Sequence, residues 1–190
     1  GKPSNGSGCG NETASEMPMF RKFMIDSSMF WAKEYKLGGF RFDLMGLHDV
    51  ETMNQLTKNL HENVDPTITV YGEPWTGGDS ALSSGAAKQA SMNSYKGYGC
   101  FNDQMRDALI KGGMNGIAAK GWITNNEEKV TLSDVNAIKS GIAGKVLSSN
   151  STHEVEKCVN YVTCHDNYTL YDRIKAAGIE DDETVKKMAM

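Results

Sequence analysis

The stretch GGFRFDLMGLHDV, residues 38–50, decides how the fold is interpreted. Its first half reads as a short buried strand with apolar residues at Phe40 and Phe42, yet Arg41 and Asp43 alternate with them. Side chains two residues apart on a strand share one face, so Arg41 and Asp43 point the same way. An unpaired buried charge is costly. The charged face therefore indicates either a functional site or an ion pair that serves structure alone.

The composition is that of an ordinary globular protein. The chain has 190 residues, which is enough for one sizeable core. Of all its residues, 39% are hydrophobic and 23% are charged. Its formal net charge of −4 argues against nucleic acid as a partner, because phosphate binding needs a basic face. No apolar run approaches the ~20 residues of a membrane span, so a membrane is not an expected partner.

Apolar periodicity predicts helices alternating with short strands. In the first helix, Phe23 and Trp31 follow the spacing of a buried face, Ser15 is the predicted N-cap, and glycines 38–39 end the helix. Asp49 is the predicted N-cap of the second helix. Helices are expected near 15–36, 49–63, 103–111, 133–140, 170–177 and 181–190, and strands near 40–44, 67–71, 98–101 and 159–164. This alternation predicts α/β architecture with a parallel sheet, and no linker divides the chain into two domains.

Charged side chains stand at the carboxyl end of three predicted strands. The first strand gives Arg41 and Asp43, the second is followed by Glu73, and the last by His165 and Asp166. α/β sheets and (β/α)-barrels place their chemistry at this edge. A single strand-end carboxylate is commonly the N-cap of the next helix, but three of them, two beside an arginine or a histidine, favour a shared site. Glu is also a poor N-cap.

Three carboxylates around one cavity suit the cleavage of glycosidic bonds. A retaining glycosidase uses two carboxyl groups about 5–5.5 Å apart, one as nucleophile and one as proton donor. A third carboxylate can hold the hydroxyl groups of the sugar and favour the protonated donor. Asp43, Glu73 and Asp166 fit these parts, with Arg41 and His165 in support.

Short motifs carrying these residues resemble those of a known family. The segments GFRFDLMG (39–46), YGEPW (71–75) and YVTCHDN (161–167) are similar to signature segments of the alpha-amylase superfamily, glycoside hydrolase family thirteen. They occur in the order found in that family. With NGSGCGNETASE (5–16), they look most like the type I pullulanase group, debranching enzymes that cut α-1,6 bonds in pullulan and starch.

The resemblance implies a role for each candidate residue. Asp43 becomes the nucleophile, Glu73 the general acid/base, and Asp166 the carboxylate that binds and distorts the sugar. Arg41 orients Asp43, and His165 bonds sugar hydroxyls.

The resemblance implies contacts with substrate for two further residues, each with a structural alternative. Trp75 is similar to an aromatic that stacks on glucose, with a packed loop tryptophan as the alternative. Asn167 ends its motif as a substrate-binding or merely structural residue. The loop 5–11 is expected at the rim of the site.

The resemblance also implies a partial (β/α)8 TIM barrel. Residues 1–190 would hold roughly strands four to seven with their helices, and the first three strands and the last strand of the catalytic domain would be missing. The family's first signature segment is not found in this sequence. We expect such a chain to have little activity by itself and to self-associate through exposed sheet edges, because unpaired strands are ready to pair.

Several functional alternatives remain open from the sequence. Besides α-1,6 hydrolysis, the motifs fit an α-1,4-acting amylase or a glucanotransferase, or a non-catalytic glucan-binding module. The expected partner is an α-glucan such as pullulan, starch or glycogen. The chemistry requires no organic cofactor; no metal-ligand set is assigned, although structural calcium is common in the family. A secreted or cell-surface location is expected, with a cytoplasmic one as the alternative.

Overall fold

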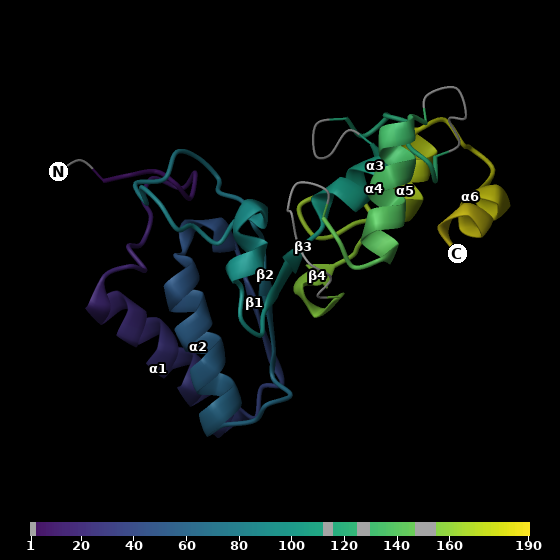
Figure 1. Cartoon of the computed structure of the whole chain (residues 1–190). Helices are drawn as coiled ribbons and strands as arrows, with labels where there is room; N and C mark the ends of the chain where they lie inside the picture. Colours follow the sequence, from purple (N-terminus) through teal and green to yellow (C-terminus); the bar gives the residue numbers. More distant parts are fainter. Residues whose placement is uncertain (1–2, 112–115, 125–129, 147–154) are drawn as a thin grey trace. The chain divides into compact units, whose positions relative to one another are not determined.

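The computed structural model describes residues 3–111, 116–124, 130–146 and 155–190 (Figure 1). These residues form two units, each with its own internal contacts. The first contains residues 3–101 together with 155–159, and the second contains the described residues of 102–146 and 160–190. That residues 1–190 form one partial catalytic domain stays a prediction.

The first unit contains the predicted parallel sheet. Its strands are β1 (Gly39–Phe42), β2 (Thr69–Gly72), β3 (Gly99–Phe101) and β4 (Cys158–Val159), hydrogen-bonded in the order β1-β2-β3-β4 with every pair parallel. Sequential order with parallel pairing is what successive βα units produce. The α/β prediction is confirmed, and the sheet is consistent with a partial barrel.

The last strand is shorter than the sequence predicts. A strand over 159–164 was expected, but β4 ends at Val159. The side chain of Asn160 donates from Nδ2 to the carbonyl oxygen of Gly141 (2.7 Å) and accepts from Asn102 Nδ2 (3.0 Å). These side-chain bonds hold the backbone after Val159 within the second unit, where it does not continue as a strand.

Helix α2 (Val50–Asn63) supplies much of the core of the first unit. Its residues Met53, Leu56 and Leu60 are fully buried, as their spacing predicts. Short 3₁₀ helices complete the unit: η1 (Met45–Leu47), η2 (Gln89–Ser94) and η3 (Val155–Lys157).

Both predicted caps of helix α1 (Pro18–Tyr35) are wrong. The N-cap is Met17, which makes no side-chain capping bond, and proline opens the first turn instead. Ser15 is fully buried and bonds to Asp49. At the other end, Lys36 takes the left-handed conformation (φ 57°) that was expected of a glycine.

The buried face of α1 also differs from the predicted one. Helix α1 lies beside α2 (Figure 1) and buries Met24, Ser28 and Ala32. The neighbouring face exposes four aromatic side chains that we call the aromatic band: Phe23, Phe30, Trp31 and Tyr35. Met19 is also exposed but is not part of this band. The small side chains of Ser28 and Ala32 suit a close helix–helix contact, which explains why this face was selected.

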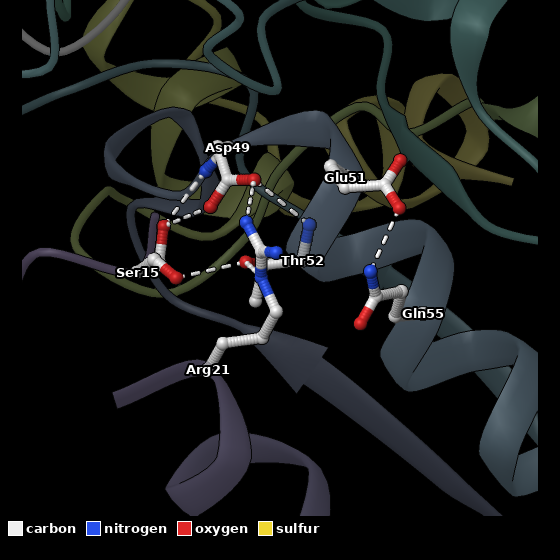
Figure 2. Close-up of polar contacts among 6 residues, drawn as sticks. All are labelled: Ser15, Arg21, Asp49, Glu51, Thr52 and Gln55. Carbon is white, nitrogen blue, oxygen red and sulfur yellow. Dashed lines mark hydrogen bonds and ion pairs between the residues drawn. The ribbon is translucent and has the colours of Figure 1, made fainter. Parts of the chain in front are cut away.

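A buried polar network joins the segment before α1 to the first turn of α2 (Figure 2). Asp49 is the N-cap of α2, as predicted, and accepts from the backbone N–H of Thr52 (2.9 Å), from Ser15 Oγ (2.7 Å) and from Arg21 (3.2 Å). The hydroxyl of Thr52 in turn donates to the carbonyl oxygen of Ser15 (2.9 Å) and accepts from Arg21 Nε (2.7 Å). Every polar group in the cluster therefore has a partner, which removes the cost of burying it.

The second unit is helical in its described part. Its helices are α3 (Asp103–Ile110), α4 (Leu132–Ile142), α5 (Leu170–Ala176) and α6 (Asp182–Ala189), within two residues of the predicted bounds. Each begins with a side chain that accepts a backbone N–H of the first turn, from Asn102, Thr131, Thr169 and Asp181 respectively. Among all the described helices, none combines the length and the apolar character needed to cross a membrane.

We expect Asp49→Ala to destabilise the chain. The substitution removes the N-cap and leaves Ser15 and Arg21 without their shared acceptor, so the free energy of unfolding should fall by about 2 kcal/mol at pH 7. Urea unfolding followed by circular dichroism measures the change. Glu51→Ala, on the exposed side of the same turn, is the matched control and should shift stability by less than about 0.5 kcal/mol.

The difference in the free energy of unfolding between wild type and Asp49→Ala should depend on pH. Burial opposes ionisation of Asp49, but the hydrogen bonds from Thr52 and Ser15 and the charge of Arg21 outweigh it, and the pKa lies below its usual value. A depressed pKa stabilises the fold above the unfolded value of about 3.9 and loses that contribution as pH falls through the folded value. The gap between wild type and Asp49→Ala should narrow below about pH 4; a gap that stays constant to pH 2 would show that the Asp49 charge is not involved.

Candidate active site

The register of β1 and β2 brings the first two candidate carboxylates to one edge of the sheet. Phe42 pairs with Gly72, and the backbone N–H of Glu73 donates to the carbonyl oxygen of Phe42 (3.0 Å). The two chains therefore leave the sheet side by side, with Asp43 following β1 and Glu73 following β2. Their proximity follows from the parallel pairing alone.

Arg41 bridges the two carboxylates. Its Nη1 contacts Asp43 Oδ1 and its Nη2 contacts Glu73 Oε1, both at 2.5 Å. One carboxylate oxygen of Asp43 lies within 4.8 Å of one of Glu73. The Asp43 side chain is 68% exposed and that of Glu73 only 10%. The expected orientation of Asp43 by Arg41 is thus present, and the same guanidinium also binds Glu73.

The backbone around Glu73 fixes its position further. Glu73 Oε2 accepts from the N–H of Leu44 (2.7 Å), and its carbonyl oxygen accepts from the N–H of Gly46 (2.9 Å). Leu44 adopts φ 43°, ψ 45°, a conformation unfavourable for a side chain of its size. Gly46 lies so close to the segment after β2 that an added Cβ would stand 2.5 Å from the carbonyl oxygen of Trp75.

An aromatic group lies beside these charges. Phe101, at the end of β3, is stacked with Trp75 (centroids 6.3 Å apart, 29° between planes) and meets Tyr71 edge-on at 5.5 Å. The Arg41 guanidinium lies 5.7 Å from the centre of the Phe101 ring. Sequence reasoning missed Phe101; its position at the end of a strand was the signal that could have indicated it. Trp75 is half-buried against this ring, and its contact with glucose stays a prediction.

His165 and Asp166 lie in the second unit. His165 Nε2 is 3.5 Å from Asp166 Oδ2, and His165 Nδ1 is 3.3 Å from Cys164 Sγ. Asp166 has φ 63°, in the left-handed region. Both side chains are at least half exposed. Their predicted convergence with the two carboxylates of the first unit stays a prediction.

Asn167 makes a local contact in the structure. Its Oδ1 accepts from the backbone N–H of Tyr168 (2.8 Å). This bond fits the structural alternative for Asn167, and its predicted contact with substrate is not tested.

Comparison with known proteins gives a consistent result. The chain is 36% identical over 191 residues to the pullulanase of Bacillus subtilis, a match that includes 98% of this chain. Among solved structures, pullulanase from Bacillus acidopullulyticus is 40% identical with a TM-score of 0.87 over 99% of this chain. Pullulanase from Paenibacillus barengoltzii, solved in complex with maltohexaose and α-cyclodextrin, is 39% identical with a TM-score of 0.85 over 98% of the chain. No protein-family model matches.

These relatives are much longer than the chain. The matched region is 26% of the Bacillus subtilis protein, 22% of the Bacillus acidopullulyticus structure and 29% of that from Paenibacillus barengoltzii. The chain therefore spans about a quarter of the length of its relatives.

The bridge by Arg41 should be measurable without any enzymatic activity. A double-mutant cycle of Arg41→Met with Glu73→Gln, read from urea unfolding of the 190-residue chain, should give a coupling energy of about 1–3 kcal/mol because Glu73 is buried. The matched cycle of Arg41→Met with Asp43→Asn should give less than about 0.5 kcal/mol, because Asp43 is exposed to solvent. Equal coupling in the two cycles would contradict the difference in burial between Glu73 and Asp43.

Proposed function

We propose that this chain supplies catalytic residues of an α-glucan debranching hydrolase, because it is homologous to pullulanases over nearly its whole length. The reaction is retaining hydrolysis of α-1,6-glucosidic bonds in pullulan and starch. The observation that carries the proposal is the pair Asp43 and Glu73, whose nearest oxygens lie within 4.8 Å at one sheet edge. That separation suits a retaining mechanism better than an inverting one, which needs about 6.5–9.5 Å.

In the first step Asp43 attacks the anomeric carbon. The glycosidic C–O bond breaks as the ester to Asp43 forms, and Glu73 gives its proton to the departing oxygen. In the second step Glu73 takes a proton from water, the water oxygen bonds to the anomeric carbon, and the ester bond breaks. Asp43 is the accessible carboxylate and Glu73 the enclosed one, which suits these two roles.

Substrate must change the contacts of Glu73. Both of its oxygens accept hydrogen bonds in the structure, one from Arg41 and one from the N–H of Leu44. A proton donor needs one oxygen free to carry the proton toward substrate. We infer that the Arg41 contact is released when glucan binds, because the bond to Leu44 is a backbone bond fixed by the turn.

We also propose substrate-binding roles for Asp166 and His165, which belong to the second unit. Asp166 would hold hydroxyl groups of the distorted sugar, and His165 would donate to a hydroxyl of the same ring. Their support is the resemblance of the motif around them and the homology of the chain. Trp75 and Asn167 stay proposed as further glucan contacts on the same grounds.

The test compares the complete enzyme that contains this chain with its variants. Glu73→Gln should lower kcat on pullulan by at least about 10³-fold, since general acid catalysis is lost, while glucan binding persists. Asp43→Asn should do the same. The isolated 190-residue chain should release little or no reducing sugar from pullulan; turnover near that of the complete enzyme would refute this expectation.

The choice of substrate separates the remaining possibilities. Cleavage of amylose in preference to pullulan would replace debranching by an α-1,4-acting amylase or glucanotransferase. Full activity of both the Glu73→Gln and the Asp43→Asn enzyme, with glucan still bound, would indicate that this chain is a binding module and not a catalytic one.

Self-association of the isolated chain is proposed as well. The predicted surface for this contact is the exposed sheet edges, and in the described sheet β1 and β4 are the outer strands. The aromatic band exposed on α1 is a second surface through which two copies can meet. Within the band, Phe23 and Trp31 stand four residues either side of Ser27, a small residue. A second copy packing antiparallel across Ser27 would cover it by a two-fold contact.

We expect sedimentation velocity to show a concentration-dependent dimer of the isolated chain. Phe23→Glu with Trp31→Glu should abolish the dimer, because a charge placed in an apolar contact is costly. Trp122→Glu, at an exposed tryptophan of the second unit, is the control. In a background in which the exposed Cys9 and Cys164 are replaced by serine, Ser27→Cys should form a disulfide-linked dimer in air. A monomer at every concentration tested would exclude this contact.

Three attributes rest on the resemblance alone and stay proposals. We propose a secreted or cell-surface location for the parent enzyme and glycogen as a further substrate. Structural calcium is proposed as the one inorganic component; chelation followed by a thermal scan of the complete enzyme tests it, with a lowered Tm expected.

A further inference from the structure

Two polar segments of the first unit, residues 4–12 and 76–81, lie against each other. The carbonyl oxygen of Gly6 accepts from the N–H groups of both Gly77 and Gly78, each at 2.9 Å. Ser4 Oγ donates to the carbonyl oxygen of Asp79 (3.1 Å). The approach is so close that a Cβ added to Gly77 would stand 2.2 Å from the carbonyl oxygen of Ser7. At Gly77 the contact is therefore made by backbone alone, with no room for a side chain.

Glu12 closes the end of this contact. Its Oε1 accepts from the N–H of Ala81 (2.5 Å) and from Ser80 Oγ (3.2 Å). Its Oε2 is buried and has no hydrogen-bond partner among the described residues. The Glu12 carboxylate thus accepts hydrogen bonds from a loop that has no regular secondary structure. A capping side chain does the same for the free N–H groups at the start of a helix.

The loop held by Glu12 continues directly from the candidate active site. Residues 76–81 follow Glu73 and Trp75, which are fixed by Gly46 and Phe101 at their own end. The segment is therefore held at both ends by contacts outside itself. A loop ordered in this way needs no further ordering when substrate binds, which preserves affinity.

We propose that Glu12 is a positioning residue for the glucan site. By holding Ser80 and Ala81 it keeps the 76–81 loop in place, so that the site wall beside Glu73 and Trp75 is formed before substrate arrives. The proposal rests on the function proposed above for Glu73. Glu12 touches no reacting atom in this arrangement, and a loop that is no longer held in place must be ordered when substrate binds, which costs affinity.

The test uses the complete enzyme that contains this chain, with three variants. Glu12→Ala should lower kcat/KM on pullulan by about 10-fold or more, chiefly through KM, without moving the pH profile. Glu12→Gln keeps an acceptor oxygen and should stay within about 3-fold of wild type. Glu34→Ala removes an equal charge from the exposed end of α1 and should leave the kinetics unchanged.

Amide hydrogen exchange supplies a readout that does not depend on activity. In the 190-residue chain, Glu12→Ala should raise exchange at Gly77, Gly78 and Ala81, while Glu12→Gln should not. Unchanged exchange in Glu12→Ala would overturn the positioning role, and so would raised exchange with unchanged kinetics. If the wild-type enzyme cleaves no α-glucan, the proposed function fails, and exchange still decides whether Glu12 anchors the loop.

Discussion

One guanidinium between two carboxylates is the interaction on which the candidate site depends. Arg41 reaches Asp43 along its own strand and Glu73 across the sheet. Without it, a nearly buried Glu73 would stand beside another negative charge, and like charges at this distance repel. A lysine would not reproduce this geometry, because its ammonium is a single point charge, whereas the planar guanidinium directs two separate nitrogens at the two carboxylates.

The parallel sheet makes that bridge possible. Register places the end of β1 opposite the end of β2, so a residue two before Asp43 faces both carboxylates. The turn after β1 then commits its backbone to Glu73 through Leu44 and Gly46. Strain at Leu44 is tolerated because these bonds and the packing around Gly46 fix the turn. The position of Glu73 is thus determined more by its neighbouring strand than by its own.

A second polar network holds the segments that lead to and from this site. The Asp49 network ties the approach to α1 to the start of α2, the helix that follows the Asp43 turn. The segment that leads to Ser15 also carries Glu12, which holds the loop after Trp75. The residues before α1 therefore contact the loops that follow both β1 and β2. This explains why a glycine-rich segment far from either strand in sequence belongs to the same unit.

Sequence alone determined the alternation of helices and strands, the parallel sheet and the candidate residues at strand ends, because local periodicity and short motifs carry that information. The Asp49 cap was also predictable, since capping is a local interaction. Tertiary structure decided what depends on neighbours: which face of α1 is buried, why Ser15 bonds to Asp49 instead of capping, where β4 ends, and that Phe101 joins Arg41 and Trp75. These outcomes follow from packing and from hydrogen bonds between residues distant along the chain, and no local pattern specifies them.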